Sequence, residues 1–396
     1  MEQRFFHGDQ LINRNNNFLF IPKYLILIIL GGALIFISCK KKGCTDPNSL
    51  NYDENAQVDD GTCEYNNYNP TPYELVIPPL FNQYILPPLI PLENPTTIEG
   101  VQLGRKLFYD PILSGDNSQS CASCHNQSNA FTDPNPFSSG IDGILGSRNA
   151  MPIFNVAWNY DENFFWDGRA SSVENQAFEP VVNPIEMHET WPNAIAEIQN
   201  HNEYPGLFYQ AFGTEIIDST LVTKAIAQFE RTLISGNSKF DKFLNNEISL
   251  SPSELSGFNI FMDENGGDCF HCHGDPTNPL WTDNLFHNNG LDASFIDEGL
   301  GAISGNPNDI GKFKTPSLRN LIFTPPYMHD GRFSTLDEVI MHYSTGLVFS
   351  STIDPLMKKV SQGGAQLTPQ EIIDLKAFLL TLTDSTIILN SNFSQP

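Results

Sequence analysis

The chain has 396 residues, of which 46 are acidic and 21 are basic, so its formal net charge at pH 7 is −25. This excess of negative charge argues against a nucleic-acid partner and against adsorption to anionic lipid, although it permits a basic protein partner. The length is too great for one small core and is sufficient for two domains.

The first 39 residues predict an export signal. Basic residues precede an apolar run over residues 24–37, which is followed by Ser38 and Cys39. The run is shorter than the roughly 20 residues that a helix needs to span a bilayer. A small residue followed by cysteine resembles a bacterial lipobox, so we expect residues 1–39 to be a lipoprotein signal peptide with lipid on Cys39. An uncleaved membrane anchor is the alternative, and both interpretations place the protein in the periplasm or cell envelope.

Residues 40–94 are expected to form an acidic segment closed by a disulfide, followed by a linker. In an oxidising compartment Cys44 and Cys63 should pair and close a short loop that contains several aspartates. The carboxylates of this loop could hold Ca²⁺, but a solvated acidic turn is the more ordinary interpretation. A stretch rich in proline and asparagine follows from Tyr65 to about Asn94 and is typical of a linker.

Beyond residue 95 the sequence contains a weak internal duplication. A Gly-x-x-aliphatic-Phe pattern occurs at residues 104–108 and again at residues 257–261. An amphipathic helix is predicted over residues 221–233, and capping boxes at Ser251 and Thr368 predict the starts of two more helices. Strand signals are few. We therefore expect a mostly α fold with one domain over residues 95–236 and a second over residues 237–396.

Each half contains one Cys-x-x-Cys-His motif. A single motif could also be a redox dithiol or half of a zinc site, but two copies on an exported chain predict two covalently attached c-type haems. In such a site the two thiols bond the porphyrin, and the imidazole that follows binds the iron. The haem-binding residues are therefore expected to be Cys121, Cys124 and His125 in the first half and Cys269, Cys272 and His273 in the second.

Four further motifs accompany the haem motifs. They are Phe-Phe-Trp-Asp-Gly-Arg at residues 164–169, Gln-x-x-x-Pro-x-x-Asn-Pro-x-Glu-Met at 176–187, Lys-Thr-Pro-Ser-Leu-Arg-Asn at 314–320 and Thr-Pro-Pro-Tyr-Met-His-Asp-Gly at 324–331. With these motifs the chain resembles the bacterial dihaem cytochrome c peroxidase/MauG family over about residues 95–385. The resemblance implies two cytochrome c-type haem domains packed together.

The resemblance also implies roles for four residues around the first haem. Glu186 would lie in the distal pocket, where it accepts a proton from the proximal oxygen of peroxide and helps to deliver it to the leaving oxygen. Gln176 and Pro180 match pocket residues, and Trp166 matches the indole that carries electrons between the haems. Without these motifs, Glu186 would be interpreted as a helix-start or surface carboxylate and Trp166 as an ordinary core residue.

The first iron is expected to have an open position. In the classical peroxidases of this family, a histidine on the loop after the first haem motif blocks that iron until the other haem is reduced. Residues 126–187 contain no histidine, and the loop instead reads Ser-Ser-Gly-Ile-Asp-Gly at residues 138–143. We therefore expect a resting enzyme that needs no reductive activation.

At the second haem, Tyr343 aligns with the usual distal ligand, which is methionine in the peroxidases and tyrosine in MauG-type proteins. On a helix over residues 334–343, at about 100° per residue, Met341 points away from the inward face. That inward face comprises Leu336, Val339, Ile340 and Tyr343. A phenolate ligand would stabilise oxidised iron and lower its potential. The alternative is a packed Tyr343 with Met328 or His329 as the ligand.

The family also holds a Ca²⁺ between the haems, through one asparagine side chain and backbone carbonyls. Asn149, Thr324 and Pro326 match these positions, and ligation by oxygen atoms suits Ca²⁺. An asparagine in a loop has no such meaning by itself, so this site depends on the resemblance.

These features predict a lipid-anchored dihaem peroxidase. It would reduce H₂O₂ to water at the N-terminal haem, with electrons that enter through the C-terminal haem from a small cytochrome c or copper protein. The alternative is a MauG-like oxidant that acts on a protein or organic substrate through a high-valent iron state. A pure electron-transfer cytochrome is disfavoured by Glu186 and by the missing histidine. Because peroxidases of this family are often dimers, a homodimer is a further hypothesis.

Overall fold

The computed structural model describes residues 40–47, 49–64 and 68–396. The chain divides into two compact units, of which the first ends at residue 67 and the second comprises Tyr68–Pro396. The expected signal peptide, with its lipidated Cys39, lies outside the described residues. No helix in the described part of the chain is long and apolar enough to cross a membrane.

The first unit is a small loop structure that contains a disulfide between Cys44 and Cys63. Two short strands, β1 (Lys42–Gly43) and β2 (Val58–Asp59), pair in parallel within it. Cys44 is buried, so the disulfide lies in the small interior of this unit.

The acidic side chains of this loop are engaged locally. Asp53 forms an ion pair with Lys41 at 2.6 Å. The carboxylates of Asp59 and Asp60 accept hydrogen bonds from backbone N–H groups two residues later, as aspartates commonly do in turns. Among the described residues of this unit, no three carboxylate, histidine or cysteine ligands lie close enough together to hold a metal ion.

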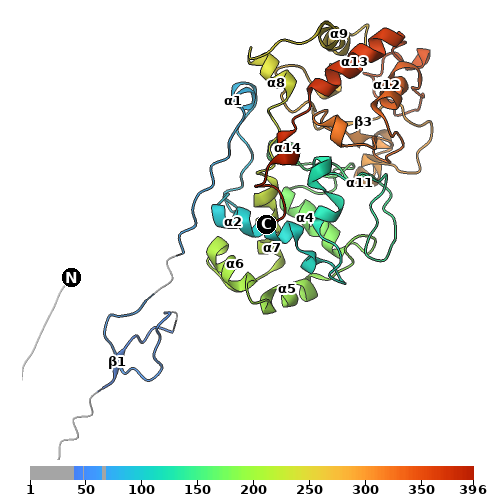
Figure 1. Cartoon of the computed structure of the whole chain (residues 1–396). Helices are drawn as coiled ribbons and strands as arrows, with labels where there is room; N and C mark the ends of the chain where they lie inside the picture. The colour runs from blue at the N-terminus through green and yellow to red at the C-terminus, as the bar shows by residue number, and fades with distance from the viewer. Residues whose placement is uncertain (1–39, 48, 65–67) are drawn as a thin grey trace, which may run out of the picture. The chain divides into compact units, whose positions relative to one another are not determined.

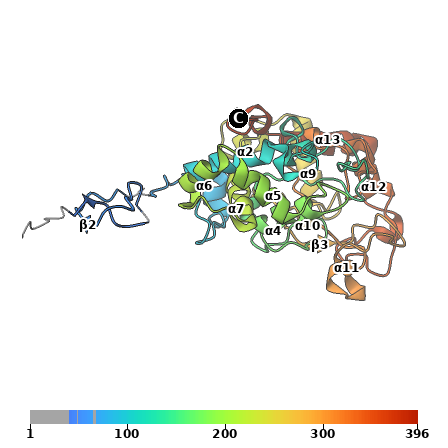
Figure 2. The same ribbon diagram turned by 90° about the horizontal axis from the view of Figure 1, so that it is seen from below.

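The second unit is mostly helical, as the sequence predicts, and its helices fall into two groups (Figure 1). The first half contains α1 (Pro79–Tyr84), α2 (Ile98–Tyr109), α3 (Cys121–Cys124), α4 (Val173–Val182), α5 (Trp191–Asn200), α6 (Tyr204–Phe212) and α7 (Ser219–Glu230). The remaining helices are α8 (Lys239–Leu244), α9 (Pro252–Met262), α10 (Phe270–His273), α11 (Leu300–Ser304), α12 (Leu336–Thr345), α13 (Pro369–Thr381) and α14 (Thr386–Leu389). Strands β3 (Phe286–His287) and β4 (Phe313–Lys314) pair antiparallel. Seen from below, α12 and α13 lie at the opposite end of this unit from α6 and α7 (Figure 2).

A glycine in each half allows two helices to approach closely. A Cβ atom on Gly104 of α2 would lie 1.8 Å from a backbone carbonyl oxygen of α7, so no larger residue fits there. A Cβ atom on Gly257 of α9 would likewise lie 1.9 Å from a backbone carbonyl oxygen of α13. Phe108 and Phe261, one turn later in each case, are fully buried. The duplicated Gly-x-x-aliphatic-Phe pattern therefore marks the same close helix contact in the two halves.

The predicted helix starts are confirmed. Ser251 and Glu254 form a capping box at the start of α9, and Thr368 and Glu371 form one at the start of α13. In each pair, the hydroxyl and the carboxylate satisfy backbone N–H groups that the first turn leaves without a helical partner. The amphipathic helix predicted over residues 221–233 corresponds to α7.

Two segments differ from the expected domain boundaries. Phe81 of α1 packs edge-on against Trp158, with ring centroids 5.0 Å apart, so the segment before Asn94 is packed on the globular unit rather than free as a linker. After α13 the chain returns to the first half, where Ile387 of α14 is part of the core. The side chain of Gln127 donates to two carbonyls of this tail. The end of the chain therefore completes the first half, although the sequence suggested that it belonged to the second.

Candidate functional site

The first cysteine motif borders a large cavity in the first half. Helix α3 is a single turn over Cys121–Cys124, begun by a capping box at Ser120, and His125 follows it directly. Nδ1 of His125 lies 3.0 Å from the carbonyl oxygen of Phe131, which leaves Nε2 as the ring nitrogen available to a metal. The cavity has a volume of about 650 Å³, within the usual range for cofactor sites.

Burial sets the protonation of the groups in both motifs. It raises the pKa of Cys121, Cys269 and Cys272 to about 12, whereas the thiols of reactive dithiol motifs have lowered pKa values. Burial also lowers the pKa of His125, and that of His273 to about 4. Both imidazoles are therefore neutral at pH 7, as metal ligation requires. The motifs fit haem attachment better than a redox dithiol.

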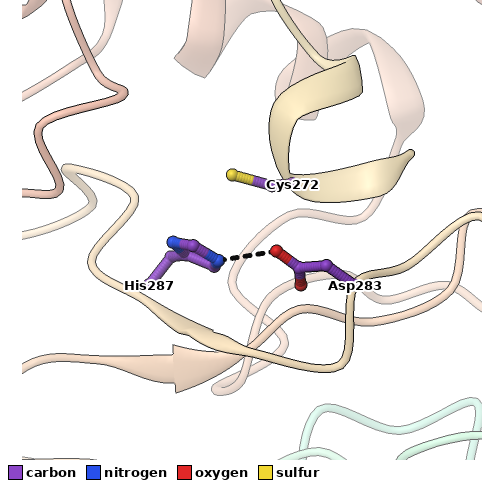
Figure 3. A group of neighbouring side chains, drawn as sticks. All are labelled: Cys272, Asp283 and His287. Atoms are coloured by element: carbon purple, nitrogen blue, oxygen red, sulfur yellow. Dashed lines mark hydrogen bonds and ion pairs between the residues drawn. The ribbon is translucent and has the colours of Figure 1, made fainter. Parts of the chain in front are cut away.

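Near the second motif, three potential metal ligands lie close together. The ligand atoms of Cys272, Asp283 and His287 lie within 4.8 Å of one another (Figure 3). The two ring nitrogens of His287 contact Asp283 at 2.8 Å and Asp354 at 2.6 Å. Although burial opposes the charge, these aspartates raise the pKa of His287 to about 9. In this structure His287 is therefore a protonated imidazole held between two aspartates, and the group is an ion cluster beside the second cysteine motif.

Glu186 faces the first cavity from the segment that follows α4. The side-chain amide of Asn183, at the end of α4, donates to Oε1 of Glu186 at 2.6 Å. Burial raises the pKa of Glu186, although Asn183 and Arg169 oppose this effect. Gln176 and Pro180, both on α4, line the same cavity. The structure thus brings these three residues together, and Glu186 is not a surface carboxylate.

The loop over residues 138–143 packs on the backbone beside Glu186. The N–H of Ile141 donates to the carbonyl oxygen of Glu186 at 3.0 Å. A Cβ atom on Gly140 would lie 2.3 Å from the carbonyl oxygen of Ile185, so only glycine permits this close approach of the two backbone segments. In the described part of the chain, His125 is the one histidine that lines this cavity.

Trp166 is buried and lines both the first cavity and a second cavity in the other half. Its indole Nε1 donates to the carbonyl oxygen of Asn149 at 2.8 Å, and its own carbonyl accepts from the N–H of Lys314 at 2.9 Å. The ring of His329 contacts Trp166 edge-on, with centroids 6.5 Å apart, and stacks on Phe313 at 3.6 Å. Aromatic contacts therefore continue from Trp166 into the second half.

The second cavity contains His273 and one face of α12. The prediction for this face is confirmed, because Leu336, Val339, Ile340 and Tyr343 all line the cavity, whereas Met341 is 44% exposed. The amide of Asn289 donates to the hydroxyl oxygen of Tyr343 at 3.1 Å. Burial raises the pKa of Tyr343 to about 12, and the Asn289 hydrogen bond opposes it.

The alternative ligands of the second iron lie in the same cavity. The sulfur of Met328 is 3.6 Å from the amide nitrogen of Asn289, which also contacts Tyr343. His329, by contrast, has its ring stacked on Phe313. The geometry therefore leaves Tyr343 and Met328 as the stronger candidates.

The three residues that match a Ca²⁺ site, Asn149, Thr324 and Pro326, all line the second cavity. The side-chain nitrogen of Asn149 donates to the carbonyl oxygen of Asn135 at 2.9 Å, so its amide oxygen is the atom available to a cation. Trp166 donates to the backbone carbonyl of Asn149, which ties this segment to the indole.

Charged residues that sequence reasoning did not single out also line the first cavity. Arg148 forms ion pairs with Asp167 and Asp297, and Arg169 forms ion pairs with Asp167 and Glu179. Motif 164–169 contains two of these residues, but nothing local in the sequence indicates their distant partners.

Two further buried groups on the cavity wall were missed. Glu230, at the end of α7, is 4% exposed, and burial raises its pKa to about 8. Lys314, in β4, is 8% exposed and lines both cavities. Two sequence features could have indicated these residues. Glu230 lies on the predicted amphipathic helix, and Lys314 is the first residue of motif 314–320.

Known proteins resemble this chain over most of its length. The family model for di-haem cytochrome c peroxidase matches residues 98–249. The methylamine utilization protein MauG of Methylophilus methylotrophus is 34% identical over 293 residues, which cover 74% of this chain and 84% of that protein. The cytochrome c551 peroxidase of Nitrosomonas europaea is 33% identical over 303 residues, which cover 75% of this chain and 84% of that protein.

A solved structure shows the same fold at similar identity. It is that of a MauG-like protein associated with microbial copper homeostasis, with a TM-score of 0.74, 35% identity, and coverage of 82% of this chain and 99% of that one. Both cysteine motifs, the neutral imidazoles and the adjoining cavities fit the two c-type haems that this family implies. The chain therefore belongs to the dihaem cytochrome c peroxidase/MauG family and is an oxidoreductase of the peroxidase type.

Proposed function

We propose that the protein reduces H₂O₂ to water at the N-terminal haem site, with electrons that arrive through the C-terminal haem. Each peroxide takes up two electrons and two protons and yields two water molecules. The bound haem supplies the iron position for peroxide and the change of oxidation state. The observation that carries the proposal is Glu186, a carboxyl with a raised pKa that lines the same cavity as His125.

The role of Glu186 is to move a proton within the bound peroxide. Its carboxylate would accept the proton from the proximal oxygen, and the resulting acid would deliver that proton to the distal oxygen. That oxygen could then leave as water, with the haem supplying the two electrons that cleavage of the O–O bond requires. The hydrogen bond from Asn183 holds one carboxyl oxygen in place. Burial raises the pKa of Glu186 above its ordinary value, and a raised carboxyl pKa suits a group that accepts a proton and then returns it.

The first site is proposed to be open at rest. The segment between His125 and Glu186 contains no histidine, and the loop over residues 138–143 docks on Glu186 through backbone contacts. Met151 also lines the cavity, and its backbone contacts the imidazole of His125. Peroxide would then react without prior reduction of the second haem.

Electrons are proposed to pass between the two sites by way of Trp166, which lines both cavities. The donor is proposed to be a small cytochrome c or copper protein. A donor with a basic surface fits a chain of net charge −25, since complementary charge increases the rate of encounter.

A MauG-like oxidant is the second candidate, and Tyr343 favours it. A phenolate oxygen stabilises oxidised iron, and the amide of Asn289 donates to that oxygen. Such an enzyme would remove electrons from a protein or organic substrate. The MauG relative and the peroxidase relative are almost equally similar to this chain, so their names do not decide between the two functions.

Three further features complete the proposal. Lipid on Cys39 would hold the protein in the periplasm or cell envelope. The protein would form a homodimer, as peroxidases of this family often do. Asn149, Thr324 and Pro326 would hold a Ca²⁺ between the haems. A chelator that removes this ion is expected to slow peroxide turnover, and equal rates before and after chelation would contradict the site.

The direct test is a stoichiometric turnover assay. The holoprotein is mixed with H₂O₂ and a reduced small cytochrome c, and both consumption rates are followed. Oxidation of two donor molecules per peroxide supports the peroxidase. If peroxide is consumed only when an oxidisable protein or organic compound is present, and reduced cytochrome has no effect, the MauG-like oxidant is the correct function.

A further inference from the structure

Lys314 occupies a position between the two haem cavities. It belongs to β4, its backbone N–H donates to the carbonyl oxygen of Trp166 at 2.9 Å, and the residue lines both cavities. The residue is 8% exposed, so its ammonium group is largely removed from water.

The contacts of this ammonium do not include a carboxylate. Nζ donates to the carbonyl oxygen of Asn163 at 2.8 Å and lies 5.5 Å from the centre of the Phe164 ring. Among the described residues, no aspartate or glutamate forms an ion pair with it. By contrast, Arg148 and Arg169, the other cations that line the first cavity, are each paired with two carboxylates.

A buried ammonium with one carbonyl partner is incompletely compensated. An ammonium has three N–H donors, and a buried charge needs an opposite charge or several hydrogen bonds to offset its desolvation. Burial lowers the pKa of Lys314 to about 8, although the charge of Asp161 opposes this effect, so the group is still mainly protonated at pH 7. Asp161 acts on this charge only through its field, without an ion pair, so an anion that enters one of the two cavities would complete the compensation.

Each c-type haem has two propionate carboxylates, which are anions of the required kind. We propose that Lys314 binds a haem propionate through a charge-assisted hydrogen bond and thereby positions that haem and raises its reduction potential. This inference rests on the two haems of the proposed function. A fixed positive charge stabilises the reduced haem, which has one more electron, relative to the oxidised haem.

The test compares Lys314→Met with the wild-type holoprotein. Lys312→Met is the matched control, because Lys312 lies in the same segment but is paired with Asp309. Spectroelectrochemical titration should show a lower midpoint potential for one haem in Lys314→Met and unchanged potentials in the control. The haem whose potential falls is the one that Lys314 binds, and its propionate bending mode in resonance Raman spectra should shift as well.

Haem content separates this inference from the proposed function. A pyridine haemochrome assay that finds two haems per chain, together with unchanged potentials and Raman modes in Lys314→Met, would overturn the role of Lys314 and leave the haems intact. Fewer than two haems in the wild-type protein would instead contradict the dihaem proposal.

Two more variants protect the test against a failure to fold. Lys314→Gln retains a donor for Asn163 but no charge, so it should lower the same potential as Lys314→Met. Lys314→Arg retains the charge and should keep the potential closer to that of the wild-type protein. A role in folding alone predicts similar potentials in all variants that retain both haems.

Discussion

The proposed chemistry makes its sharpest prediction at Glu186. Glu186→Gln preserves the shape of the side chain and removes its ability to accept a proton. Loss of a positioned acid–base group typically costs about 10²- to 10⁴-fold in rate, which corresponds to roughly 3–5.5 kcal/mol in the activation barrier. We expect a loss in this range for the second-order reaction with H₂O₂, measured by stopped-flow absorbance of the holoprotein.

The loss of rate in Glu186→Gln should not be accompanied by a loss of thermal stability. The amide oxygen of glutamine can still accept the hydrogen bond from Asn183. The raised pKa of Glu186 shows that its ionised form is disfavoured in the folded protein. The Glu186→Gln variant, whose side chain is neutral, should therefore unfold at the same temperature as the wild type or at a slightly higher one. Glu179→Gln is the control on the same cavity wall, where the carboxylate is paired with Arg169 at 2.7 Å. We expect this control to lose less than about tenfold in rate.

The pH dependence adds an independent readout. Because the carboxylate is the form that accepts a proton, the rate should fall as the pH drops through the raised pKa of Glu186, and Glu186→Gln should lack this acid limb. A Glu186→Gln rate within about threefold of the wild type, with the acid limb retained, would refute the proton transfer assigned to this residue.

Three other predictions concern the second half. Tyr343→Met should raise the potential of the C-terminal haem in a redox titration, since a thioether stabilises oxidised iron less than a phenolate, and no change would mean that Tyr343 is not the ligand. Arg319→Met should lower the free energy of unfolding by about 3–5 kcal/mol, measured by denaturant titration, because it leaves Asp241 buried without its cation. His287 has a folded-state pKa of about 9, above its unfolded value, so its stabilising contribution is complete below pH 6.5 and is lost as the pH rises toward 9. The unfolding free energy of His287→Gln should therefore depend less on pH between 7 and 9, and parallel curves would contradict this.

Much of the fold could be predicted from local patterns. The capping boxes at Ser251 and Thr368 depend on neighbouring residues only, and both form as expected. Helical periodicity was also sufficient to place Tyr343 on the inward face of α12 and Met341 outside. Gly104 and Gly257 were recognised as a repeated pattern, although the sequence did not reveal that each admits another helix.

The features that were missed depend on contacts between distant segments. Ile387 follows the last long helix in the sequence, and nothing local indicates that it returns to the core of the first half. The ion cluster around His287 requires Asp354, which is 67 residues away. Nζ of Lys314 donates to the backbone carbonyl of Asn163, and this buried contact between distant segments becomes visible only in three dimensions.

The measurement that tests the central claim most directly is low-temperature EPR of the resting diferric protein, followed by addition of one equivalent of H₂O₂. The account predicts one high-spin and one low-spin ferric signal, and both should diminish on addition of peroxide without prior reduction. Two low-spin signals that remain unchanged until one electron is added would contradict it, because a protein side chain would then occupy the sixth coordination position of the first iron at rest.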